Sequence, residues 1–90
     1  MMEFKYCFEK NAILLKTRGV GFEEIIQAIS DGQLLDIKYH HNKEKYPNQQ
    51  ILYVRILDEV YAVPFVQNNQ ELFLKTIFPS RKARKFYLNK

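Results

Sequence analysis

Apolar residues recur at two different spacings along this chain, and the spacing changes between its N-terminal and C-terminal halves. In the segment 22–29 they return every three to four positions, which predicts a helix with one face turned to a core. The apolar positions of this stripe are Phe22, Ile25, Ile26 and Ile29. Residues 9–17 also read as a helix, ended by Gly19, because glycine readily adopts the left-handed conformation of a helix cap. The N-terminal half is therefore predicted to be mainly helical.

The C-terminal half follows a period of two, which is typical of strands. The long predicted strands are 51–57, 61–67 and 72–78, and shorter ones are predicted at 4–8 and 34–37. The long strands are joined by turns so short that neighbouring strands must be antiparallel. Pro64 cannot donate a hydrogen bond to a sheet, so we expect a bulge or an edge position there. The pattern predicts an α+β fold, with two N-terminal helices, a small antiparallel sheet and a C-terminal helix.

The closing segment is basic and contains aromatic residues. Residues 80–90 hold five of the 14 Lys and Arg of the chain and none of its 10 Asp and Glu, so the net charge of +4 is concentrated there. Helical projection turns Ala83, Phe86 and Tyr87 toward the sheet. The opposite side carries the cations Arg81, Arg84 and Lys85. Such a face is typical of binding to phosphates or to an acidic partner, and a plain solvated helix surface is the alternative.

Length and composition limit the remaining possibilities. With 90 residues and 47% hydrophobic content, we expect one domain that spans residues 1–90. No apolar stretch approaches the ~20 residues needed to cross a bilayer, and the N-terminus lacks the layout of a signal peptide. A cytoplasmic protein without membrane contact is therefore expected. The single cysteine, Cys7, is expected to pack as a small apolar residue.

Three cations stand at positions where a sheet would hold them in place. Arg81 marks the junction between the last strand and the closing helix, where its planar guanidinium could contact a phosphate through two hydrogen bonds. Arg55 and Lys75 lie within predicted strands, and together they would form a positive floor if they shared one side of the sheet. An arginine within a strand more often pairs with an acid, and that alternative stays open.

The two histidines, His40 and His41, lie in a polar loop at 39–50. They are the only side chains whose unperturbed pKa lies close to neutral pH, so either could act as a general acid or base. An exposed loop histidine without a function is the alternative. Adjacent side chains in extended backbone point to opposite sides, and no cysteine or acid cluster is near, so no metal site is expected. The sequence also lacks a glycine-rich phosphate loop, and we expect no cofactor.

Two stretches of sequence resemble a known family. The first consists of residues 8–11 (FEKN) and residues 17–24 (TRGVGFEE), and the second is residues 76–83 (TIFPSRKA). In this order they are similar to the BrnT-type toxins of bacterial type II toxin–antitoxin systems, small basic proteins with a RelE-like fold. The chain departs from the family pattern at Glu9, Arg18 and Pro79.

The resemblance implies a toxin that cuts mRNA, inhibits translation and growth, and is silenced by a cognate antitoxin, commonly one with a ribbon-helix-helix domain. The RNA substrate would be free or ribosome-associated. Only Arg81 occupies a position that the resemblance carries over.

Metal-independent RNA cleavage needs cations on the phosphate, a base for the 2′-hydroxyl and an acid for the departing oxygen. The residues predicted to be catalytic are Arg81, Arg55, His41 and His40. Those predicted to bind RNA are Lys75, Lys82, Arg84, Lys85, Tyr46 and Tyr87. The scarcity of acid and base groups favours an alternative from another class: a non-catalytic toxin or binding module that acts on a protein such as DNA gyrase, or on nucleic acid.

Overall fold

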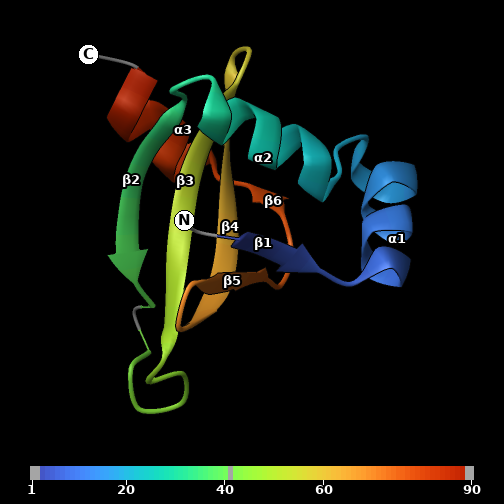
Figure 1. Ribbon diagram of the computed structural model, residues 1–90. Coiled ribbons are helices and arrows are strands. Elements are labelled where there is room, and N and C mark those ends of the chain that lie inside the picture. Colours follow the sequence, from blue (N-terminus) through green and yellow to red (C-terminus); the bar gives the residue numbers. More distant parts are fainter. Residues whose placement is uncertain (1–2, 41, 89–90) are drawn as a thin grey trace.

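The computed structural model describes residues 3–40 and 42–88 (Figure 1). The first four elements are β1 (Glu3–Tyr6), α1 (Phe8–Arg18), α2 (Phe22–Ser30) and β2 (Leu34–Tyr39). The remaining elements are β3 (Gln49–Ile56), β4 (Glu59–Asn68), β5 (Glu71–Leu74), β6 (Phe78–Pro79) and α3 (Arg81–Leu88). The α+β class predicted from the periodicity is confirmed.

The strands form one mixed sheet in the order β1-β5-β4-β3-β2, and β6 pairs with β4. The pairs β2–β3, β3–β4 and β4–β5 are antiparallel, and for β3–β4 and β4–β5 the short predicted turns require this direction. The sheet is not wholly antiparallel, because β1 pairs in parallel with β5. Short turns fix the direction of consecutive strands only, whereas β1 meets a strand far along the chain and is free to take either direction.

Pro64 explains why the predicted strand 72–78 is divided in two. It lies within the central strand β4 in unbroken register with Ile51 of β3, so no bulge is present on that side, but on the other side the pairing is interrupted between Leu74 and Phe78. The carbonyl of Pro64 accepts a hydrogen bond from the Lys75 amide at 2.8 Å. A residue with an N–H would return a second bond to Lys75, as antiparallel hydrogen-bonded pairs do. Proline has no N–H and cannot form this second bond. Strand β5 ends at Leu74, one residue before Lys75.

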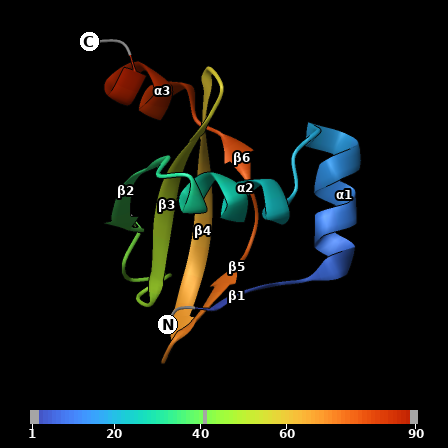
Figure 2. The ribbon, with the colours of Figure 1, turned by 45° about the horizontal axis from the view of Figure 1, so that its top comes forward.

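Helix α2 covers one face of the sheet, where most of the core lies, and α1 stands to the side of the sheet, beyond the start of α2. Figure 2 shows α2 crossing β3 and β4. Phe22, Ile25 and Ala28 of α2 are buried, and the partly buried Ile26 and Ile29 pack against the same cluster, so the predicted apolar stripe is confirmed. The rest of the cluster comes from α1, the α1–α2 turn, the sheet and the segment before β6: Leu14, Val20, Leu52, Val54, Val63, Phe65, Leu72, Leu74 and Ile77.

The turn between α1 and α2 is fixed by backbone and side-chain contacts. Gly19 has φ 72°, the predicted left-handed cap, and its amide donates to the Leu15 carbonyl. The Asn11 side-chain oxygen accepts from the Phe22 amide at 2.7 Å, and the Glu24 carboxylate accepts from the Gly21 amide at 2.7 Å. These bonds satisfy amides that the start of α2 leaves without an intrahelical partner.

Helix α3 packs on the opposite face of the sheet. That face carries the buried residues Ile51, Val60 and Ala62, and α3 contacts β4 and buries Ala83. Among the helices of the described ranges, none combines the length and apolar character that crossing a bilayer requires.

Candidate functional site

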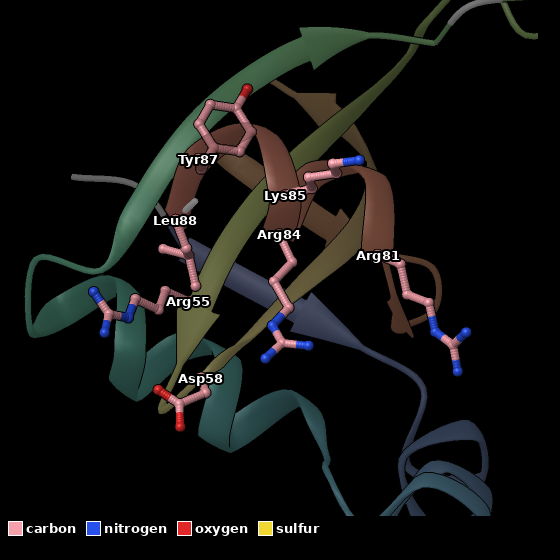
Figure 3. A pocket seen from close by; sticks show the side chains of 7 residues that line it. All are labelled: Arg55, Asp58, Arg81, Arg84, Lys85, Tyr87 and Leu88. Carbon is pink, nitrogen blue, oxygen red and sulfur yellow. The ribbon is translucent and has the colours of Figure 1, made fainter. Parts of the chain in front are cut away.

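An open pocket of about 640 Å³ lies between α3 and the turn that joins β3 to β4 (Figure 3). Its lining residues are Arg55, Asp58, Arg81, Arg84, Lys85, Tyr87 and Leu88. We call it the basic pocket, because four cationic side chains and a single carboxylate line it. The cations come from two elements that are distant in sequence, so the fold gathers positive charge beyond the closing helix.

The start of α3 is tied to the sheet, and this fixes where Arg81 stands. Ser80 donates its amide to the Val60 carbonyl of β4 at 2.9 Å, and its hydroxyl accepts from the Ala83 amide at 3.2 Å. A serine in this position caps the helix. Because Arg81 follows Ser80 directly, its backbone is held by both β4 and the cap.

Arg55 reaches the pocket from the other side. Its Nε donates to the Leu57 carbonyl at 2.9 Å, which holds the exposed side chain against the β3–β4 turn. Leu57 has φ 56°, so the turn uses a left-handed residue to bring Asp58 beside this arginine. Only Nε is used in the hydrogen bond, and the two terminal nitrogens keep the forked geometry that matches a phosphate.

Arg84 and Arg81 differ in how far they are already neutralised. Arg84 Nε lies 3.7 Å from a carboxylate oxygen of Glu59, and both side chains are about half exposed, at 52% and 49%. An ion pair this exposed is weak. The side chain of Arg81 forms no hydrogen bond or ion pair with any residue of the described part of the chain. In Figure 3 the guanidinium groups of Arg84 and Arg81 project from α3, whereas that of Arg55 comes from β3 and points away from them, so the three groups do not meet at one point.

The other predicted lysines lie outside the basic pocket. Lys75 shares the face of the sheet on which Arg55 lies, but its Nζ stands 5.0 Å from the centroid of the Phe73 ring, and it does not line the pocket. Lys82 lines a second pocket, on the other side of α3. The positive floor envisaged from Arg55 and Lys75 is therefore not a single site.

The loop residues lie at the opposite end of the sheet from α3 (Figure 1). The ring of His40 packs against the ring of Tyr46, with centroids 4.5 Å apart, and neither residue lines the basic pocket. His41 lies outside the described residues. The structure thus brings together Arg55, Arg81, Arg84, Lys85 and Tyr87 of the predicted site, and it does not bring His40 or Tyr46 to them.

The second pocket measures about 630 Å³ and is lined by Lys38, Tyr53, Ser80, Lys82, Ala83, Phe86 and Tyr87. We call it the aromatic pocket. Phe86 was expected to face the sheet, yet its side chain is 68% exposed. The reason is that α3 touches the sheet through Ala83, and Tyr87 lies over Tyr53 at 5.9 Å between centroids. This rotation places Phe86 at the outer side, beside Lys38 of the edge strand β2.

Tyr87 is held by a short hydrogen bond, its hydroxyl donating to Asp36 Oδ2 at 2.6 Å. Burial and this bond raise the pKa of Tyr87 to about 12, and the same bond, with a second from the Ile37 amide, lowers the pKa of Asp36. Tyr87 therefore remains a phenol near neutral pH and acts as a donor, not as a base.

The raised pKa predicts an alkaline titration step. The folded-state pKa of Tyr87 exceeds the ordinary value of 10.0, so its contribution to stability is present below pH 10.0 and is lost as the pH rises toward about 12. Asp36 acts at the other end, and its contribution is lost as the pH falls through its lowered pKa. Phenolate absorbance should show a step near pH 12 that Tyr87→Phe removes. Tyr39→Phe, which leaves the bond to Asp36 intact, should retain the step; its loss in that control would contradict the assignment.

Two contributions escaped sequence reasoning. Asp58 was given no role, although it lies three residues after Arg55, in the short turn that follows the first long strand. The contact between Lys38 and Phe86 could not be predicted, because no periodicity tells which side of α3 meets β2.

Comparisons of the chain with protein-family models, with curated proteins and with solved structures give no match.

Proposed function

We propose that the protein is the toxin of a type II toxin–antitoxin system and that it binds and cleaves RNA through the basic pocket. The observation that carries the proposal is the gathering of four cations around one open pocket that holds a single carboxylate. Charged hydrogen bonds from Arg and Lys to phosphate are strong, and neutralised phosphates release counterions. The resemblance to BrnT-type toxins supports RNA as the polyanion and the cytoplasm as the place of action.

Cleavage requires the ribose 2′-hydroxyl to attack its adjacent phosphate. The new bond gives a 2′,3′-cyclic phosphate, and the bond to the 5′ oxygen of the next nucleotide breaks. Arg81 and Arg55 would stabilise the charge that builds on the non-bridging oxygens. Asp58, the carboxylate that lines the pocket, would accept the 2′-hydroxyl proton, and Lys85 would supply a proton to the departing 5′ oxygen. Tyr87 is not assigned to proton transfer, because its hydroxyl is engaged by Asp36.

The proposal includes a cognate antitoxin. The resemblance points to one with a ribbon-helix-helix domain, and an acidic segment of such a partner would suit the same cations. Covering Arg81 and Arg55 would silence the toxin without any change in its fold, since both side chains are exposed.

One observation favours a binding function without cleavage. No histidine among the described residues lines the basic pocket, so no group there ordinarily titrates near neutral pH. In this second reading the protein is a non-catalytic toxin or binding module that acts on nucleic acid or on a protein such as DNA gyrase.

The two readings differ in the fate of the RNA. Purified protein incubated with labelled single-stranded RNA and a metal chelator should release fragments that end in a cyclic phosphate and begin with a 5′-hydroxyl. RNA that is bound but stays intact would support the binding-only function, and absence of both binding and cleavage would refute the proposal. In cells that express the chain without an antitoxin, transcripts should be broken before DNA replication slows.

A further inference from the structure

The aromatic pocket differs in chemistry from the basic pocket on the other side of α3. Its lining contains three aromatic rings and two lysines and no carboxylate. The Phe86 ring is exposed but not isolated: Lys38 Nζ lies 5.5 Å from its centroid, and the Tyr87 ring meets it edge-on at 4.9 Å. Tyr87 is itself fixed by its bond to Asp36. The exposed ring thus stands in a defined place, with a cation at its face.

We propose that the aromatic pocket holds an unpaired base of single-stranded RNA, stacked on Phe86, while the phosphates of the same strand contact the basic pocket. This inference rests on the proposed function, because it needs RNA on α3. It adds two statements to that function: the substrate is single-stranded RNA, and Phe86, which was not among the predicted site residues, contacts it.

The two pockets are close enough to be served by one strand. Tyr87 lines both, and only α3 separates them, a helix about 10 Å across. Lys38 and Lys82 continue the positive charge around the helix, so a backbone that leaves the basic pocket stays among cations. Grooves that combine such a charged track with aromatic rings are typical of proteins that bind single strands.

The pocket suits a base better than it suits a duplex. A base can reach the ring only when it is unpaired and turned out of a helix, because a paired base buries its faces in the stack. Stacking on Phe86 tolerates any base, since each has a flat face, and the hydroxyl groups of Tyr53 and Ser80 could bond to its edge.

The test compares one substitution on two nucleic acids. Fluorescence anisotropy would measure the binding of the full chain to a short labelled oligo(A) and to the oligo(A)·oligo(U) duplex. Phe86→Leu keeps an apolar side chain but removes the ring, and it should weaken single-strand binding about tenfold. Duplex binding, which uses phosphates alone, should stay the same. Phe86→Tyr retains the ring and should bind the single strand as the wild type does.

Three outcomes would overturn the inference. Unchanged single-strand binding by Phe86→Leu, with the wild type still binding RNA, would remove the stacking role and leave the proposed function standing. An equal loss on single strand and duplex would show a general effect on α3. Failure of the wild type to bind either RNA would refute both proposals. Because Phe86 is 68% exposed, the thermal midpoint of each variant should match that of the wild type and serve as the folding control.

Discussion

Replacing Arg81 by alanine should abolish the growth arrest expected of the proposed toxin, reduce RNA cleavage by about 10²–10³-fold and weaken RNA binding about tenfold. Arg81 is the cation whose backbone the sheet and the Ser80 cap hold in place, and its side chain has no hydrogen bond or ion pair within the described residues to give up. The full strength of a charged hydrogen bond is therefore available to a phosphate. Cleavage rates and binding curves on one RNA, with growth curves in cells, would measure the effects.

Two control variants separate the role of this guanidinium from general charge. Arg81→Lys keeps the charge but not the fork, and it should retain binding better than cleavage. Lys16→Ala removes an exposed cation of α1 and should change neither. The dependence of the logarithm of affinity on the logarithm of salt concentration should fall by about one in Arg81→Ala, the value for one phosphate contact. Undiminished cleavage and arrest in Arg81→Ala would exclude this residue from the site.

Phe22→Ala should lower the free energy of unfolding by about 3–5 kcal/mol. The Phe22 side chain is 0% exposed, and its ring stacks on Tyr6 of β1 with centroids 5.0 Å apart. Truncation leaves a cavity between α2 and the sheet, because packed neighbours relax only in part. Domains of ordinary stability have about 5–15 kcal/mol, so much of the margin would be lost. Urea unfolding at equilibrium would measure the change as a lower midpoint.

Phe8 provides the matched control for this substitution. It also contacts the Tyr6 ring, with centroids 5.6 Å apart, yet its side chain is 79% exposed. Phe8→Ala should therefore cost about 0.5 kcal/mol or less. Equal losses in the two variants would show that burial at α2 is not what stabilises the fold.

Local signals in the sequence predicted the helices and the hairpins, because these depend on neighbours in the chain. The stripe that contains Phe22 and Ile25 and the cap at Gly19 are examples. The parallel pairing of β1 with β5 could not be predicted, since no periodicity records which distant strands meet. The sequence shows that Pro64 cannot donate a hydrogen bond to the sheet. It does not show that β5 is the strand that loses this bond, because that depends on the pairing register.

The part of the candidate site that lies on α3 could be predicted from the sequence. Arg81, Arg84 and Lys85 were read from the closing segment, and Arg55 joins them because alternation along β3 puts it on the face that α3 covers. The position of the polar loop could not be predicted from the sequence, so His40 was assigned to a site that it does not line. The rotation of α3 depends on how closely the small Ala83 approaches the sheet, and this decides which way Phe86 points.

The ion pair between Arg84 and Glu59 is a weak internal competitor for any anion that reaches Arg84. Glu59 already gives Arg84 a negative partner, so a phosphate that arrives there exchanges one anion for another. At Arg84 a lone carboxylate would gain little over Glu59, whereas a polymer with several charges would also reach the other cations of the basic pocket. If the proposed function holds, Glu59 would reduce the gain from a single small anion at Arg84 more than the gain from a polyanion that also contacts the neighbouring cations.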